Sequence, residues 1–240
     1  EGGQPSDLGT AATDIDTVIL TVLNANQTED VLFGPGGIVT SLKAGAVVLA
    51  CATVPPTFAK DMAARCGESG VLCLDAPISG GSLKAAQGQL SIMASGTPEA
   101  FTAARPALDS IAQTVFELGD EPGAGSAMKA VNQLLAGVHI AAMAEALTFG
   151  MTQGVAPQKF VEVISQCAGT SWMLENRAPH IVAGDYTPHS SVNIWPKDLG
   201  IVLDIAKTVE FDAPITAAAL RQFVAAAGMG HGQEDDAAVA

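Results

Sequence analysis

The chain has 240 residues, and its 25 acidic and 11 basic side chains give a formal net charge of −14 at pH 7. This charge argues against a nucleic-acid binder or a partner of acidic membranes, because both need clustered Lys and Arg to neutralise phosphate. With 48% hydrophobic and 15% charged residues, the chain can bury a sizeable core, which excludes a disordered chain and predicts a soluble globular protein.

The first half of the sequence alternates short apolar runs with amphipathic stretches. Buried strands are predicted at Thr17–Leu23, Ala46–Ala52 and Val71–Leu74. Helices are predicted between them, at Gln27–Phe33 and Phe58–Glu68. Strands separated by helix-length segments indicate βαβ units and a largely parallel sheet.

Two more strands are predicted at Leu90–Ser95 and Val115–Leu118, joined by a helical segment that Pro106 should break or restart. The pattern changes after Gly119. Ser126 is predicted to cap a long helix that continues to about Gly150, too long for a strand.

The rest of the chain is predicted to be almost wholly helical. These helices are expected at Pro157–Cys167, Trp172–Ile181, Lys197–Thr208 and Pro214–Ala227. The tail, residues 228–240, is expected to be a solvated end. The patterns therefore predict an α/β part with a mostly parallel sheet, a boundary near Gly123, and an all-α part after it.

The four cysteines indicate a reducing compartment. Cys51, Cys66, Cys73 and Cys167 form no CxxC pair and lie in or beside apolar segments. This favours reduced, buried thiols in a cytosolic protein over a metal site or a set of disulfides.

The first candidate site follows the third strand, where Asp75 is followed by Ala-Pro-Ile and then by Ser79, Gly80 and Gly81. Ligands of open α/β sheets lie beyond the carboxyl ends of the strands, and two glycines let backbone N–H groups approach an anion such as a carboxylate. An ordinary strand-to-helix turn explains the same residues equally well.

The second candidate site is the start of the long helix. Lys129, Asn132 and Gln133 are spaced i, i+3 and i+4, so all three lie on one helix face. A lysine among Ala, Val and Leu is expected to be partly desolvated, which suits it to proton transfer. Asn132 can orient a hydroxyl beside it. A surface lysine that lays its stem along the helix is the simpler alternative.

Two weaker features lie elsewhere. Lys197 is predicted at the start of a later helix, where its positive charge is unfavourable to the helix dipole. This suggests that Lys197 contacts a ligand. The dipole alone explains the neighbouring Asp198. Thr53 follows the second strand and could hydrogen-bond a ribose or a carboxylate, although by itself it is more typical of a helix cap.

Taken together, three segments resemble the β-hydroxyacid dehydrogenases, a family that includes 3-hydroxyisobutyrate and 6-phosphogluconate dehydrogenases. These segments, in the order typical of the family, are the DAPxSGG segment (75–81), the GxGxxxKxxNQ helix start (123–133) and the KDL helix (197–199). The resemblance covers nearly the whole chain. The sequences of residues 52–56, 134–142 and 231–236 look most like those of the L-threonate dehydrogenase branch of this family.

The resemblance implies hydride transfer between NAD or NADP and a small hydroxy acid such as L-threonate. It implies an incomplete Rossmann-type dinucleotide domain in residues 1–123 and a helical substrate or dimerisation domain in residues 124–240. A homodimer or homotetramer in the cytoplasm is expected, with no nucleic-acid or membrane partner. Alternatives are 3-hydroxyisobutyrate oxidation, tartronate semialdehyde reduction, or a non-catalytic remnant that serves as a dimerisation or binding module.

The resemblance also implies a role for individual residues. Lys129 is similar to the family's catalytic lysine, which takes the hydroxyl proton. Asn132 would position the substrate and Gln133 would tune specificity. The substrate carboxylate would be held by Ser79, Gly80 and Gly81, and the cofactor would be contacted by Leu23, Asn24, Thr53 and Lys197. No metal is implied.

One part of the family pattern has no counterpart in the sequence. The family opens with a strand, GxGxxG and a helix, which cradle the cofactor pyrophosphate. Residues 34–37, with three glycines, follow a helical segment and lack this spacing. We expect the chain to begin at the end of the second helix of the dinucleotide fold, so that a βαβ unit of about 30 residues is absent.

Overall fold

The structure, a computed structural model, describes residues 12–240. These residues form two compact units, of which the first ends at Lys129 and the second begins at Ala130, inside the helix α6 (Ala124–Thr152). The first unit contains the strands and the second is helical. The predicted fold class, a mostly parallel Rossmann-like sheet followed by an all-α part, is confirmed.

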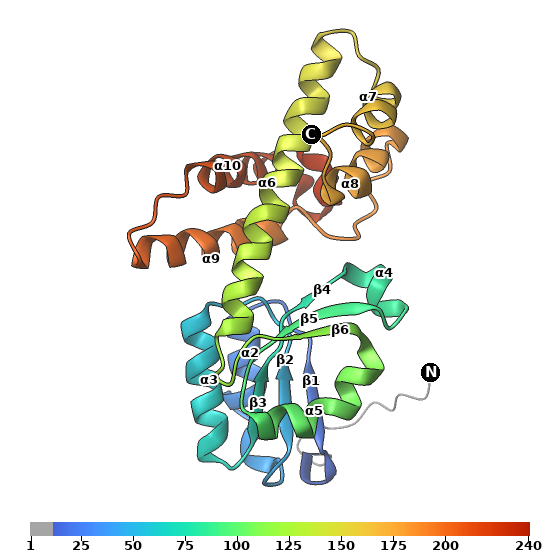
Figure 1. Ribbon diagram of the computed structural model, residues 1–240. Coiled ribbons are helices and arrows are strands. Elements are labelled where there is room, and N and C mark those ends of the chain that lie inside the picture. Colours follow the sequence, from blue (N-terminus) through green and yellow to red (C-terminus); the bar gives the residue numbers. More distant parts are fainter. Residues whose placement is uncertain (1–11) are drawn as a thin grey trace. The chain divides into compact units, whose positions relative to one another are not determined.

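The described part of the first unit has two three-stranded sheets (Figure 1). The parallel sheet has the order β1 (Thr17–Leu20), β2 (Val47–Ala50), β3 (Leu72–Asp75). In the second sheet, β5 (Leu90–Ala94) pairs antiparallel with β4 (Ile78–Ser79) and parallel with β6 (Ala112–Glu117). The helices of this unit are α2 (Ala25–Phe33), α3 (Pro56–Glu68), α4 (Gly81–Ala86) and α5 (Pro98–Ile111), with 3-10 turns at Ala12–Asp14 and Val39–Ser41.

The central strand β2 is buried on both faces, which explains its uninterrupted apolar sequence. Val47 and Leu49 belong to the hydrophobic cluster that includes α5. Val48 and Ala50 point to the opposite face and belong to the cluster that includes α2 and α3. Each fully buried Val or Leu contributes about 1.5–3 kcal/mol, so this strand anchors the sheet between the two helical layers.

Pro106 does not break its helix, and that prediction was wrong. The helix α5 continues through Pro106 to Ile111. Proline lacks an N–H group, so one backbone hydrogen bond is missing from the helix interior. The residues on both sides of it, Ala104 and Leu108, are fully buried against the sheet. Their burial holds the helix together across the proline.

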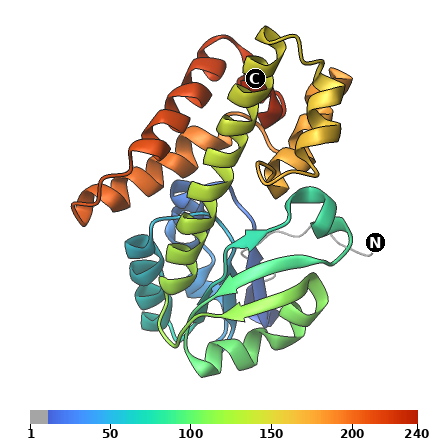
Figure 2. The same ribbon diagram turned by 45° about the horizontal axis from the view of Figure 1, so that its top comes forward.

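The second unit is built from α6 together with α7 (Pro157–Ile164), α8 (Trp172–Ala183), α9 (Ile194–Thr208) and α10 (Pro214–Gly228). Figures 1 and 2 show α9 and α10 lying side by side and running in opposite directions. Trp195 of α9 stacks on Phe223 of α10, with the ring centroids 5.4 Å apart. The core of this unit also contains Ile140, Met143 and Leu147 of α6.

By length and composition alone, α6 is apolar enough to cross a membrane. One third of its most apolar window is buried inside the protein, and Ile140 and Leu147 in that region are almost fully buried. Its Gly137 lies so close to α9 that an added Cβ would be 2.8 Å from the side chain of Leu199. These contacts place the middle of α6, residues 137–147, in the core of the second unit.

The C-terminal tail is not a solvated end, and that prediction was wrong. It forms 3-10 turns at His231–Gln233 and Asp236–Val239, and neither Asp235 nor Asp236 is exposed. Its backbone bonds to the segment before α9: the N–H of Val192 donates to the carbonyl of Glu234 at 3.0 Å. The acidic residues that suggested a solvated end are instead satisfied by buried donors.

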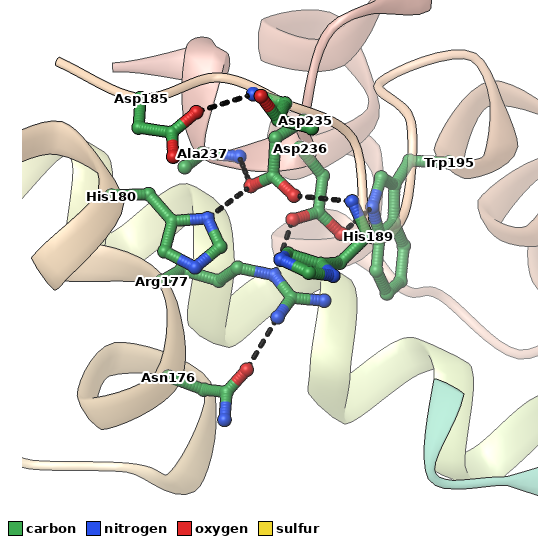
Figure 3. A network of polar contacts seen from close by, with 10 residues as sticks. Asn176, Arg177, His180, Asp185, His189, Trp195, Asp235, Asp236 and Ala237 are labelled. Carbon is green, nitrogen blue, oxygen red and sulfur yellow. Dashed lines mark hydrogen bonds and ion pairs between the residues drawn. The ribbon is translucent and has the colours of Figure 1, made fainter. Parts of the chain in front are cut away.

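Asp236 receives two of these donors, as Figure 3 shows. Arg177 of α8 donates from Nε to Oδ1 at 2.5 Å, and Trp195 of α9 donates from Nε1 to Oδ2 at 2.9 Å. Burial raises the pKa of Asp236, although the charge of Arg177 opposes this. One carboxylate therefore joins the tail to two helices of the second unit.

Asp235 accepts from the backbone N–H groups of His189 at 3.0 Å and Ala237 at 3.1 Å, and lies 3.1 Å from Nδ1 of His180. Burial acts to raise the pKa of Asp235, but these N–H groups and the charge of Arg177 lower it below its usual value. The ionised carboxylate of Asp235 therefore stabilises the folded tail.

The cysteine prediction is right for three residues and wrong for the fourth. Cys51, Cys66 and Cys73 are buried free thiols, whereas Cys167, in the turn after α7, is exposed. Burial and the nearby Asp75 raise the pKa of Cys51 to about 12, so this thiol is protonated and unreactive at neutral pH.

We expect Asp235→Asn to destabilise the protein in a pH-dependent way. A carboxyl with a lowered folded-state pKa stabilises the fold above its unfolded pKa, and this contribution is lost as the pH falls through the folded pKa. The loss of unfolding free energy in Asp235→Asn should therefore be largest near neutral pH and shrink below the ordinary Asp pKa of 3.8. Urea unfolding at several pH values measures it, with the exposed Asp212→Asn as control. A pH-independent difference would contradict this assignment.

Candidate functional site

The helix α6 begins at a buried carboxylate supplied by the sheet. Asp75, the last residue of β3, is 1% exposed. Its Oδ2 accepts from the backbone N–H groups of Gly123 at 2.9 Å and Ser126 at 2.8 Å. Its Oδ1 accepts from the Ser126 hydroxyl at 2.7 Å. Because the first N–H groups of a helix have no partner within it, Asp75 acts as the cap of α6. The prediction that Ser126 is the cap was wrong, since Ser126 lies inside the first turn and donates.

A serine and a glycine complete this junction. The hydroxyl of Ser95 donates to Oδ2 of Asp75 at 3.4 Å and accepts from the N–H of Gly125 at 2.9 Å. A Cβ on Gly125 would lie 2.4 Å from the carbonyl oxygen of Met93, so the helix start lies directly against the sheet backbone. Burial raises the pKa of Asp75, and the hydrogen bonds from Ser126, Gly123 and Ser95 oppose this.

Lys129 follows this anchored first turn, in the part of α6 that belongs to the first unit. Its side chain is buried, with 8% of the residue exposed. This excludes the alternative of an ordinary surface lysine. A buried lysine is held in a narrow range of positions, which a proton-transfer group requires.

The residues expected to hold a carboxylate form the turn between β4 and α4. Ser79 ends β4 and pairs with Ser91 of β5. Gly80 and Gly81 have φ values of +129° and +66°, in the region that favours glycine. The segment is thus a strand-to-helix turn whose glycines are required by the backbone, and its role as an anion site stays a prediction.

The residues expected to contact the cofactor follow β1 and β2. Since Leu20 of β1 pairs with Ala50 of β2, the segments after these parallel strands leave the same edge of the sheet. Leu23 is 51% exposed. Asn24 caps α2, because its Oδ1 accepts from the N–H of Gln27 at 2.9 Å.

Thr53 is not the helix cap suggested by the sequence. The N-cap of α3 is Pro55, which makes no side-chain capping bond. Thr53 therefore lies in the loop between β2 and α3, half-buried, at the edge of the sheet where α/β proteins bind dinucleotides. An exposed apolar side chain, a helix N-terminus and this loop at one sheet edge fit a nicotinamide dinucleotide.

In the second unit, Asn132 and Gln133 are joined to α9 by a chain of polar contacts. Asn132 donates from Nδ2 to Oε1 of Gln133 at 2.9 Å, and Gln133 donates from Nε2 to Oδ2 of Asp198 at 2.5 Å. Oδ1 of Asp198 lies 2.6 Å from Nζ of Lys197. The structure thus brings Asn132 and Gln133, which the sequence analysis selected on one helix face, together with Lys197, which it selected as a separate feature.

Asp198 is a residue that the sequence analysis missed. Explaining it by the helix dipole was wrong, because α9 begins at Ile194 and Asp198 lies beyond its first turn. It is 2% exposed. The available signal was an acidic residue between Trp195 and Leu199, two apolar residues of the core. Within residues 12–240, no group of three or more His, Cys, Asp or Glu side chains is arranged to hold a metal ion.

Two known protein families match successive parts of the chain. Residues 4–119 match the family described as the NAD-binding domain of 6-phosphogluconate dehydrogenase. Residues 123–240 match the family described as NAD-binding of NADP-dependent 3-hydroxyisobutyrate dehydrogenase. The fold and these matches define a nicotinamide-dependent oxidoreductase, with NAD or NADP as its cofactor.

The chain is similar to curated L-threonate dehydrogenases. It is 51% identical to that of Cupriavidus necator, over 98% of this chain and 78% of the relative, and 44% identical to that of Escherichia coli K12, over 99% and 78%. A crystal structure of 3-hydroxyisobutyrate dehydrogenase from Salmonella typhimurium has 45% identity and a TM-score of 0.91, over 95% of this chain and 79% of that chain. The chain therefore belongs to the β-hydroxyacid dehydrogenase family.

We expect Asp75→Ala to destabilise the protein by about 2–4 kcal/mol, because it leaves buried N–H groups at the start of α6 without an acceptor. Asp75→Asn keeps one acceptor oxygen and should cost less. Urea unfolding followed by circular dichroism measures both, with Asp109→Ala on the exposed face of α5 as the matched control. A loss in Asp75→Ala no larger than in the control would show that the cap contributes nothing.

Proposed function

We propose that this protein oxidises L-threonate, or a closely similar small hydroxy acid, with NAD or NADP. Identity of 44–51% to several L-threonate dehydrogenases, over 95% or more of this chain, is the observation that carries the proposal. Residues 1–123 would bind the dinucleotide, and residues 124–240 would provide substrate contacts and subunit contacts.

Lys129 is the proposed proton acceptor. The bound NAD or NADP supplies the hydride acceptor. Lys129 takes the proton of the reacting hydroxyl, which lets the alkoxide electrons form the new carbonyl as the hydride leaves the same carbon. A positioned acid–base group of this kind contributes about 10²–10⁴-fold to the rate. Its burial and the anchored first turn of α6 support this role.

The other candidate residues orient the two reactants. Ser79, Gly80 and Gly81 would hold the substrate carboxylate, while Asn132 would position the substrate and Gln133 would affect specificity. Cofactor contacts are assigned to Leu23, Asn24, Thr53 and Lys197. Holding the reacting atoms in alignment supplies much of the rate enhancement of such enzymes.

We also propose a homodimer or homotetramer in the cytoplasm. The second unit exposes large apolar side chains on two helices, a surface that self-association would cover. They are Val131, Leu135, Phe149 and Met151 on α6, and Ile215 and Val224 on α10. The free thiols support a reducing compartment.

Cofactor binding is the first test of the proposed class. We expect NAD or NADP to bind in calorimetry and to raise the melting temperature. At a cofactor concentration 100-fold above Kd, the gain in unfolding free energy is about 2.7 kcal/mol. Absence of binding at millimolar cofactor would instead support a non-catalytic binding or dimerisation module.

The role of Lys129 has a separate test. We expect Lys129→Met, which keeps the apolar stem but removes the amine, to lower kcat for L-threonate by about two orders of magnitude or more. Cofactor affinity should stay within a few-fold of wild type. The exposed Lys207→Met on α9 is the matched control. A loss confined to KM would contradict the assignment of Lys129. If the wild-type protein is more active on 3-hydroxyisobutyrate or on tartronate semialdehyde than on L-threonate, that compound is the substrate instead.

A further inference from the structure

The helix α6 is apolar on two faces, and the core of the second unit covers one of them. Ile140, Met143 and Leu147 lie on the covered face and are at most 2% exposed. In an ordinary surface helix the opposite face is polar. Between residues 130 and 152, however, Glu145 is the single Asp, Glu, Lys or Arg of the sequence. The outer face of α6 therefore has the composition of a face that is buried.

The outer face of α6 carries a regular stripe of residues. Positions 135, 138, 142, 145 and 149 are separated by three and four residues in turn, so they lie on one line along the helix. They are Leu135, Val138, Ala142, Glu145 and Phe149, and we call them the α6 stripe. Leu135 is 51% exposed and Phe149 is 65% exposed. Such a period of 3.5 residues is the pattern with which one helix packs along another.

The helix α10 extends this apolar surface. Residues 138–149 of the α6 stripe border a groove of about 340 Å³, and Ile215 and Ala218 of α10 line its other side. Ile215 is 66% exposed, and Ala218 is exposed as well. Glu145 accepts from Nε2 of Gln222 of α10 at 3.0 Å. Because the charge of the stripe has this donor, covering it costs less than covering a carboxylate without one.

The side-chain sizes of the α6 stripe fit an antiparallel copy of the stripe. Its two ends, Leu135 and Phe149, are large, and Ala142 at its centre is small. When two stripes run antiparallel with their centres together, Leu135 of one copy faces Phe149 of the other. The two alanines then meet at the centre, where small side chains let the helices approach closely. Large side chains fill the space on both sides of this point.

The charges of the stripe fit the same arrangement. With the centres together, Glu145 of one copy faces His139 of the other, a half-buried residue beside the stripe. An imidazole N–H can donate to a carboxylate. In a parallel arrangement the two Glu145 carboxylates would face each other, and like charges at an interface are costly. The net charge of −14 opposes an acidic lipid surface as the partner. Charge complementarity thus favours a second, antiparallel copy of this chain.

We propose that two copies of this chain associate through their α6 stripes, antiparallel about a two-fold axis at Ala142, with an α10 helix beside each stripe. This inference deepens the proposed self-association, on which it rests, by naming the face and the direction of packing. The same surface of both copies is used, as a two-fold axis requires. The interface is a four-helix arrangement of α6 and α10 from each copy. It covers Leu135, Phe149 and Ile215, which a monomer leaves exposed.

Ala142→Glu is the first test of this interface. Ala142 is exposed and glutamate is a good helix former, so we expect the fold to be retained. Two like charges at the axis should raise the dissociation constant by about 100-fold or more and halve the mass of the assembly. Sedimentation velocity over a range of protein concentrations measures both. Ala218→Glu, on α10, should act in the same direction. The exposed Ala64→Glu on α3 of the first unit is the matched control and should change neither quantity.

A mixing experiment tests the position of the axis. Ala142→Lys should dissociate the assembly by itself, since it also places two like charges together. When Ala142→Lys and Ala142→Glu are mixed, a residue at the axis meets the opposite charge in the other copy. We therefore expect the mixture to recover the wild-type mass, whereas each variant alone does not.

The outcomes separate this inference from the proposed function. A wild type that is monomeric at every concentration overturns the proposed self-association and this inference together, whereas cofactor binding to the same sample tests the proposed reaction independently. An assembly that both Ala142→Glu and Ala218→Glu leave intact overturns only the α6 stripe as its interface. A mixture that does not recover the mass overturns the antiparallel pairing at Ala142. Melting curves by circular dichroism identify a variant that has lost its fold, and the other variant then decides.

Discussion

A buried carboxylate at the end of a parallel strand determines where the central helix of this protein starts. Asp75 accepts from two backbone N–H groups and one hydroxyl of the first turn of α6, and Gly125 lets that turn lie against the sheet. The arrangement costs the desolvation of a charge, which several charge-assisted hydrogen bonds offset. These hydrogen bonds fix the backbone that carries Lys129 relative to the sheet.

A second carboxylate acts on the same helix through side chains. Asp198, held by Lys197, accepts from Gln133 and so orients the amide of Asn132. Both carboxylates are almost fully buried, and in both the charge matters because it accepts without donating. The catalytic lysine that we propose and the amide next to it on α6 therefore depend on acidic residues 54 or more positions away in the sequence.

Buried carboxylates of the C-terminal tail likewise hold the start of α9 by accepting hydrogen bonds. Asp236 joins Arg177 of α8 and Trp195 of α9, while Asp235 accepts from the backbone N–H of His189 in the segment before α9 (Figure 3). Removing one partner of such a buried pair leaves an uncompensated charge, which is far more costly than the loss of a surface ion pair. The tail is thus part of the helical core.

The sequence by itself determined the strand and helix pattern, the family, and the selection of Lys129, Asn132, Gln133 and Lys197. Those features follow from local periodicity and from short motifs, which depend on neighbouring residues alone. It did not reveal β4 or α4, which are too short to show a period. Nor did it reveal the cap at Asp75, the burial of Asp198 or the docked tail. Only the tertiary structure decided these, because whether an acidic side chain is solvated or buried depends on donors brought to it from distant parts of the chain.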